Sequence, residues 1–214
     1  MRRLLALNTF AAALMLPLFA AMAFAGGGSG KPAAATASDS MGPMDVPGIE
    51  LSNFGLCDSR IYRGEQPKAT EYSALKALGI STVIDLRNDS KAYARESAEA
   101  AGLKYINIKM DDGDKPYDDQ IQAFIQAVTD PANGKVYVHC AGGRHRTGAT
   151  IAVYRMAIQG WTAEAAYREM KAYDYYSRWG HGGYKKYVFE YYDRMQADPT
   201  SVPFAYTYGV NQSR

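Results

Sequence analysis

One short segment of the chain concentrates the residue types that could do covalent chemistry. The 214 residues include only two cysteines and three histidines, and His139, Cys140 and His145 fall within seven consecutive positions. Cysteine is a nucleophile only as its thiolate, so Cys140 could attack an electrophile if its surroundings lowered its pKa. We expect His139 to support this segment by hydrogen bonding. Two cysteines are too few for a disulfide framework, and three histidines leave little for a structural zinc site.

The residues that follow Cys140 have the types that bind an anion. They lie between a predicted buried strand and a predicted helix, so their amides should converge at a helix N-terminus, which attracts negative charge. That terminus and the guanidinium of Arg146 favour the Cys140 thiolate, and Arg146 offers a planar fork for two phosphate oxygens. Gly142 and Gly143 let the amides turn inward, and Thr147 can donate a hydrogen bond to the Cys140 sulfur. The candidate phosphate-binding residues are Ala141, Gly142, Gly143, Arg144, His145 and Arg146.

The elements that must position this segment alternate along the chain. Apolar runs predict strands near residues 60–63, 81–86, 103–110 and 135–139. Helical spacing and glycine stops predict helices near residues 67–78, 91–101, 118–128 and 146–159, and two more that begin at residues 162 and 183. Strands that alternate with helices predict a single α/β domain with a central, mostly parallel sheet of four to five strands flanked by helices.

The two ends of the chain are predicted to lie outside this domain. A basic start, an apolar run and an Ala-Phe-Ala end predict a secretory signal peptide at residues 1–25, with an uncleaved membrane anchor as the alternative. Residues 26–48 are predicted to be a flexible linker, residues 49–198 the domain and residues 199–214 a C-terminal tail. Cleavage would remove two of the 24 basic residues and leave 22 against 22 acidic ones. A neutral exported protein of this kind does not favour nucleic acid as a partner.

The segment around Cys140 also carries a family resemblance. Its pattern His-Cys-x-x-Gly-x-x-Arg-Thr-Gly resembles the signature loop of the protein tyrosine phosphatase superfamily, and the residues from His145 to Gly148 are especially similar to atypical dual-specificity phosphatases of plants and fungi and their bacterial relatives. Shorter matches at residues 53–55, 61–64 and 83–87 extend the resemblance over residues 50–195. The resemblance implies the cysteine-dependent phosphatase fold, a phosphocysteine intermediate, and no metal or other cofactor.

Such a mechanism needs a carboxylic acid that protonates the leaving oxygen and later deprotonates water. The family supplies an aspartate from a mobile loop about 30 residues before the cysteine. Asp112 lies 28 residues before Cys140, in the run Asp-Asp-Gly-Asp-Lys-Pro, which resembles the acid loops of tyrosine phosphatases and of regenerating-liver phosphatases. We choose Asp112 as the general acid, with Asp111, Asp114 or a merely solvated loop as alternatives.

The sequence therefore predicts an exported cysteine-dependent phosphatase of the tyrosine or dual-specificity type. Cys140, Arg146, Asp112 and Thr147 are its predicted catalytic residues, and a phosphorylated substrate is its expected partner. Positive charge from Arg144 and His145 would suit an inositol phosphate or phosphoinositide, whereas a phosphotyrosyl protein is the default of the superfamily. A rhodanese-type sulfurtransferase and a non-catalytic phosphate-binding module are more remote alternatives.

Two further features carry weaker predictions. Cys57 is expected to be a small buried residue, with a redox disulfide to Cys140 as the alternative. Eleven of the 17 tyrosines lie from Tyr154 onward, where helical spacing predicts core and rim packing. His181 lies in a predicted loop and is either structural or close to the mouth of the pocket.

Overall fold

A computed structural model describes residues 42–203 of the chain. The predicted signal peptide and most of the predicted linker lie outside the described residues, as do residues 204–214. No helix within residues 42–203 has both the length and the apolar character needed to span a bilayer.

The sheet has five strands in the order β1-β2-β5-β3-β4. The strands are β1 Gly55–Leu56, β2 Ile61–Gly64, β3 Thr82–Arg87, β4 Lys104–Met110 and β5 Val136–His139. All neighbours run parallel except β1 and β2, which are antiparallel. This arrangement confirms the predicted α/β domain with a mostly parallel sheet. It also places β5 between β2 and β3, so the residues after β5 emerge at the centre of the sheet.

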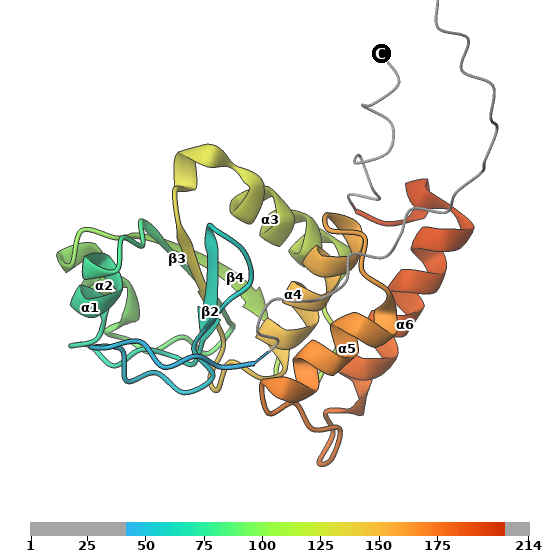
Figure 1. The fold of residues 1–214 in the computed structure, drawn as a ribbon, viewed down its shortest axis with the longest axis horizontal. Helices are drawn as coiled ribbons and strands as arrows, with labels where there is room; N and C mark the ends of the chain where they lie inside the picture. Colours follow the sequence, from blue (N-terminus) through green and yellow to red (C-terminus); the bar gives the residue numbers. More distant parts are fainter. Residues whose placement is uncertain (1–41, 204–214) are drawn as a thin grey trace, which may run out of the picture. The chain divides into compact units, whose positions relative to one another are not determined.

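Helices cover both faces of this sheet. Figure 1 shows α1 and α2 on one side and α3 to α6 on the other. The helices are α1 Tyr72–Ala77, α2 Ala94–Ala100, α3 Asp118–Thr129, α4 Arg146–Ala157, α5 Ala163–Ala172 and α6 Gly182–Ala197, with 3₁₀ turns η1 Pro131–Asn133 and η2 Pro199–Ser201. All twelve residues of α4 are buried, because α4 lies between the sheet and the helices α5 and α6.

Successive side chains of the central strands point to opposite faces of the sheet, so the core is divided into two clusters. In β5, Val136 and Val138 face the cluster formed with α3 to α6, whereas Tyr137 faces the cluster formed with α1 and α2. In β3, Ile84 and Val83 divide in the same way. Strands buried on both faces read as continuous apolar runs, which is why the sequence predicted β3 and β5 closely.

Several predicted boundaries differ from the structure. The helix expected at residues 67–78 begins only at Tyr72, because Lys68 and Glu71 form a turn in which the Lys68 amide donates to the Glu71 carboxylate over 2.6 Å. The helix expected at residues 91–101 spans 94–100. The two-residue strand β1 and the turn η1 were not predicted, since neither is long enough to show a period.

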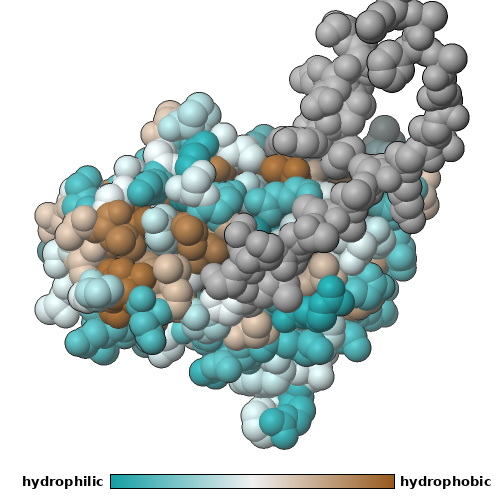
Figure 2. All heavy atoms as spheres, viewed as in Figure 1, coloured by the Kyte–Doolittle hydropathy of each residue, from teal (hydrophilic) through white to brown (hydrophobic). Residues whose placement is uncertain are grey.

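Both flanks of the domain continue past the boundaries predicted for it. The Met44 amide donates to the Phe54 carbonyl over 2.8 Å, and Met44 and Val46 pack against the cluster of α1 and α2. Residues 42–48, predicted as the end of the linker, are therefore in contact with the domain. At the other end Val202 is buried, and the Tyr191 hydroxyl donates to the Pro203 carbonyl over 2.6 Å. Figure 2 shows a largely hydrophilic face with apolar residues gathered near the end where α1 and α2 lie.

Candidate active site

The segment singled out in the sequence forms a loop between β5 and α4, at the carboxyl end of the central strand. Ligands in α/β sheets bind at this edge, where the connections on either side diverge. A pocket of about 210 Å³ opens here. It is lined by Asp112, Cys140, Ala141, Gly142, Arg144, His145, Arg146, Tyr176 and His181. The structure thus brings together seven of the predicted site residues; Gly143, Thr147 and His139 lie behind the pocket surface.

Cys140 lies at the base of the pocket in surroundings that favour its thiolate. Its side chain is almost fully buried, and burial alone would raise the pKa of the thiol. Hydrogen bonds from the Thr147 hydroxyl and amide, the charge of Arg146 and the Arg144 amide outweigh that effect, so the pKa of Cys140 is lowered. The Thr147 hydroxyl is buried and has no hydrogen-bond partner of normal geometry among the described residues, so its proton is available to the sulfur.

Three consecutive carbonyls of the loop accept hydrogen bonds from outside it. The Ala141 carbonyl accepts from the Gln66 amide over 3.1 Å, and the Gly142 carbonyl accepts from Asn53 Nδ2 over 2.9 Å. The Gly143 carbonyl accepts from the Arg63 guanidinium over 2.8 Å. Carbonyls that are held outward in this way do not face a bound anion, and they leave the inner side of the loop to amide groups.

Arg63 and Asn53 are functional residues that the sequence analysis assigned no role. Arg63 is fully buried, and its guanidinium lies 3.8 Å from the centre of the Tyr173 ring. A ring face stabilises a buried cation that has no carboxylate beside it. Asn53 has a positive φ of 53°, and its side-chain amide donates to the Gly142 carbonyl of the loop. Both residues belong to the short matches at residues 53–55 and 61–64 that extend the family resemblance. That resemblance was the one feature of the sequence that could have indicated a role for them.

Gly143 is required by the packing of the loop. Its φ is +68°, and a β-carbon there would lie 2.5 Å from the Gly64 carbonyl group. Gly142 differs, because a β-carbon at Gly142 would meet only the Arg144 side chain at 3.5 Å. The sequence predicts the same role for both glycines, whereas of the two only Gly143 occupies a position that requires glycine.

His139 contacts the backbone of the loop, and its imidazole is neutral at pH 7. Its side chain is fully buried, and Nδ1 lies 3.2 Å from the Cys140 carbonyl oxygen. Burial lowers the pKa of His139, and the nearby Asp85 carboxylate, 3.9 Å away, opposes that effect only in part. A buried neutral imidazole at the back of the loop holds a backbone carbonyl and does not reach the pocket.

The predicted positive charge of His145 is wrong at neutral pH. Burial, followed by the proximity of His181, lowers the pKa of His145 to about 4. The two imidazole rings stack with centroids 3.8 Å apart and planes within 8° of parallel. Because His145 is neutral, of the two residues before Arg146 only Arg144 adds a positive charge. It lines the pocket with a side chain that is 39% exposed and is 3.8 Å from Asp174.

Two carboxylates lie beside Arg146. Asp112 Oδ1 is 3.9 Å from one guanidinium nitrogen, and Asp89 Oδ1 is 3.6 Å from the other. Hydrogen bonding from Arg87 lowers the pKa of Asp89 to about 2, so Asp89 is ionised and has no proton to give. Asp112 lines the pocket, whereas Asp89 does not.

The two alternative aspartates point elsewhere. Asp111 accepts a hydrogen bond from Asn88. Asp114 accepts from the Tyr117 hydroxyl over 3.1 Å and from the Lys115 amide over 2.7 Å. Neither of them lines the pocket of Cys140. The geometry favours Asp112 among the three candidates.

Cys57 lies too far from Cys140 for a disulfide. Its amide donates to the Ile61 carbonyl over 2.7 Å, and Ile61 is paired with Val136 at the start of β5. Cys140 follows the other end of that strand, four residues on, which is about 13 Å at about 3.3 Å per residue. A disulfide needs α-carbons within about 7 Å of each other. Burial raises the pKa of Cys57 to about 12, so this thiol is also unreactive.

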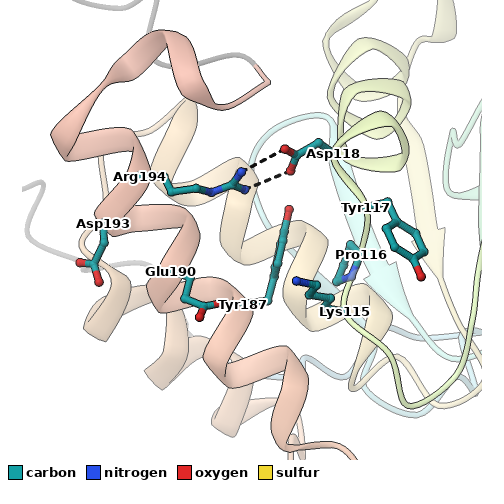
Figure 3. A pocket seen from close by; sticks show the side chains of 8 residues that line it. All are labelled: Lys115, Pro116, Tyr117, Asp118, Tyr187, Glu190, Asp193 and Arg194. Atoms are coloured by element: carbon teal, nitrogen blue, oxygen red, sulfur yellow. Dashed lines mark hydrogen bonds and ion pairs between the residues drawn. The ribbon is translucent and has the colours of Figure 1, made fainter.

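A second, larger pocket of about 580 Å³ lies between α6 and the residues that lead into α3. Figure 3 shows its lining, with Arg194 bonded to Asp118 through both carboxylate oxygens at 3.0 Å. This pocket contains none of the predicted catalytic side chains. Within residues 42–203 no group of three or more His, Cys, Asp or Glu side chains is placed to hold a metal ion.

Comparisons with known proteins find relatives among phosphatases. The chain is 27% identical over 137 residues to inositol diphosphatase DSP4 of Arabidopsis thaliana, which covers 62% of this chain and 67% of that protein. It is 28% identical over 153 residues to the dual specificity protein phosphatase TpbA of Pseudomonas aeruginosa, covering 71% of this chain and 62% of that protein. A third relative, inositol diphosphatase DSP1 of rice, is matched over 56% of its length.

Solved structures show the same fold. The core catalytic domain of the PP-IP phosphatase SIW14 from S. cerevisiae superposes with a TM-score of 0.60 at 21% identity, over 72% of this chain and 93% of that domain. A cysteine-to-serine variant of P. aeruginosa TpbA in complex with pTyr superposes with a TM-score of 0.57 at 25% identity, over 81% of this chain and all of that one. The family model described as DSP-PTPase phosphatase fused to NAD+ kinase matches residues 52–179, more than half of the chain. The chain therefore belongs to this DSP-PTPase family and is a hydrolase of the phosphatase type.

Proposed function

We propose that this phosphatase hydrolyses phosphate monoesters through a covalent phosphocysteine at Cys140. The single observation that carries the proposal is the state of the thiol. Cys140 has a lowered pKa although it is buried, and it lies beside Arg146 in a loop whose carbonyls from Ala141 to Gly143 bond to residues outside the loop. A nucleophile and an oxyanion site thus share one pocket.

In the first step the Cys140 sulfur attacks phosphorus and the ester P–O bond breaks. Arg146 and the loop amides bind the non-bridging oxygens, where negative charge is held throughout the transfer. Asp112 in its protonated form donates its proton to the leaving oxygen, so an alcohol or phenol departs. The products of this step are phosphocysteine, the free alcohol and the Asp112 carboxylate.

In the second step water attacks the phosphorus of the phosphocysteine. The Asp112 carboxylate accepts a proton from this water, inorganic phosphate forms and the S–P bond breaks. The thiolate that leaves is stabilised by the Thr147 hydroxyl and by the same charges that lower the pKa of Cys140. Cys140 and Asp112 return to their starting states, and the cycle is balanced.

Replacement of the nucleophile tests the covalent mechanism. Cys140→Ser should lose all measurable turnover of an aryl phosphate, because an unactivated hydroxyl replaces the thiolate. Wild-type enzyme should be labelled at Cys140 by iodoacetate at pH 6 and be protected by inorganic phosphate, whereas Cys57 should stay unlabelled. A Cys140→Ser variant with wild-type turnover, or a wild-type enzyme inactivated by a chelator, would show the mechanism to be wrong.

The substrate proposed first is a phosphoprotein of the tyrosine or dual-specificity type, which is the activity named for the relative TpbA. An inositol phosphate or phosphoinositide is the second candidate. It is favoured by Arg144, a half-exposed cation at the same pocket as Arg146 that could meet a second phosphate. Values of kcat/KM for phosphotyrosyl peptides, phosphoinositides and soluble inositol phosphates would separate the two. Arg144→Gln should lower only the value for the substrate that carries several phosphates.

We also propose that the protein is exported, on the basis of the predicted signal peptide at residues 1–25. N-terminal sequencing of the protein purified from the secreting cell tests this proposal. A mature chain that begins near Gly26 is expected. An intact N-terminus in a membrane fraction would favour the uncleaved anchor, and an intact N-terminus in the cytosol would contradict export.

A further inference from the structure

The internal hydrogen bonds of the loop that carries Asp112 join residues at most three positions apart. We call residues 111–117, which connect β4 to α3, the acid loop. The Asp112 side chain is 61% exposed, and Gly113 has a φ of +81° that turns the chain directly after it. Proton transfer requires the carboxyl group to lie within hydrogen-bond distance of the leaving oxygen. A carboxyl group on such a loop therefore needs contacts with the rest of the domain to stay at the pocket.

Tyr184 of α6 supplies contacts on both sides of Asp112. Its hydroxyl accepts a hydrogen bond from the Gly113 amide over 3.2 Å and donates one to the Asp111 carbonyl over 3.3 Å. The side chain is fully buried, and burial raises the pKa of Tyr184 above its ordinary range. The hydroxyl therefore keeps its proton and can donate and accept at the same time.

The same tyrosine also contacts the phosphate-binding loop. Its ring lies 5.8 Å from the ring of His145 at an interplanar angle of 23°, and 6.2 Å from the ring of His181 at 22°. His145 immediately precedes Arg146, and both His145 and His181 line the pocket. Tyr184 thus ties the acid loop to the wall of the site that binds phosphate.

We propose that Tyr184 is a positioning residue that holds Asp112 at the pocket by clamping the backbone on both sides of it. The proposal rests on the proposed function, in which Asp112 is the general acid. Tyr184 touches no reacting atom. Its effect passes through the backbone of Asp111 and Gly113.

Asn88 donates to the Asp111 carboxylate and Arg146 lies 3.9 Å from the Asp112 carboxylate, so these two contacts hold side chains of the acid loop. The remaining anchors lie at the ends of the loop. Arg146 donates to the Met110 carbonyl over 3.0 Å before the loop begins, and Arg194 binds Asp118 after it ends (Figure 3). These two contacts fix the positions at which the acid loop begins and ends. Among the described residues Tyr184 is the side chain that bonds the backbone immediately before and immediately after Asp112.

Leaving-group dependence tests the proposal. Phenyl phosphate needs a proton on its leaving oxygen, whereas 2,4-dinitrophenyl phosphate releases a stable anion without one. Tyr184→Phe should lower kcat/KM for phenyl phosphate by about tenfold, part of the factor of about 10²–10⁴ that a general acid supplies. For the dinitrophenyl ester it should change kcat/KM by less than about twofold. The ratio of the two values does not depend on the amount of folded enzyme, so partial unfolding of the variant does not affect the result.

Tyr187→Phe is the matched control. Tyr187 lies about one turn further along α6 and is also buried, but its hydroxyl has no hydrogen-bond partner among the described residues. This variant should leave the ratio of the two substrates unchanged. If Tyr187→Phe lowers the ratio as much as Tyr184→Phe does, general packing of α6 is responsible and the proposal fails.

An Asp112→Asn background separates the proposal from the function on which it rests. Once the acid is absent, adding Tyr184→Phe should lower kcat/KM for phenyl phosphate by less than about twofold. An undiminished tenfold fall in this background, or an equal fall for both substrates in the single variant, would overturn the role of Tyr184 and leave Asp112 as the acid. If Asp112→Asn itself leaves the ratio unchanged, Asp112 is not the acid and both assignments fail.

Discussion

Gly143→Ala is the substitution for which the structure gives the most specific expectation. The new β-carbon would lie 2.5 Å from the Gly64 carbonyl group, whereas ordinary contact begins near 3.4 Å, so the backbone must move by about 0.9 Å. The φ of +68° adds about 1–2 kcal/mol for an L-residue. The overlap adds about 1–3 kcal/mol, because the contact is with backbone that no rotamer change can relieve. The total is a loss of about 2–5 kcal/mol of stability.

The effect on turnover should exceed what the loss of stability explains. A displacement of about 1 Å in a catalytic loop costs on the order of 100-fold in rate. Urea unfolding and kcat on an aryl phosphate, measured on the folded fraction, would give the two quantities. Gly142→Ala is the comparison for stability, since its β-carbon meets only Arg144 at 3.5 Å, and it should cost less than about 1 kcal/mol. If the two variants are equally stable, the assignment of Gly143 as the position that requires glycine is refuted.

Three further predictions follow from the buried charges and the two cysteines. Glu169→Ala should lower the free energy of unfolding by about 3–5 kcal/mol, because it leaves Arg155 buried without its carboxylate; a loss below about 1 kcal/mol in urea unfolding would contradict this. Burial holds the pKa of His145 at about 4, below its unfolded value of about 6.5. The unfolded chain thus binds a proton that the folded chain does not, so stability should fall as pH drops from about 6.5 to 4. This fall should be smaller in His145→Gln, and an identical pH dependence would place the titration elsewhere. Peroxide treatment of the native enzyme should give no disulfide between Cys57 and Cys140, and mass spectrometry that finds one would show that the strand register does not keep them apart.

Much of the fold was predictable because its central strands are apolar on both faces. Val83, Ile84, Val136 and Val138 give runs that fit only buried strands, and a glycine marks the end of each of the helices α1, α2 and α4. The loop between β5 and α4 was predictable for a different reason. Its cysteine and arginine stand at the spacing of a phosphatase signature motif, between a buried strand and a helix, and such a resemblance is visible in the order of residues alone.

The contacts that hold the loop could not be predicted in the same way. Arg63 reaches Gly143 across 80 positions of sequence, and Tyr184 reaches Gly113 across 71. Contacts between residues so far apart leave no periodic pattern in the sequence. The charge of His145 was wrongly predicted for a related reason, since its pKa depends on burial and on a ring that lies far along the chain.

Attraction of the substrate depends on the conformation of the loop more than on the charge of the protein. The whole chain carries a net charge of only +2. At the pocket, Asp89 and Asp112 lie 3.6 Å and 3.9 Å from the guanidinium of Arg146, and His145 is neutral at pH 7. Arg144 is the remaining cation that lines the pocket, so the local charge available to a phosphate dianion is small. Backbone amides and a helix N-terminus must supply the rest, and they do so only while the carbonyls of the loop are held outward. Phosphate binding should therefore be more sensitive to the residues behind the loop than to surface charges around the pocket.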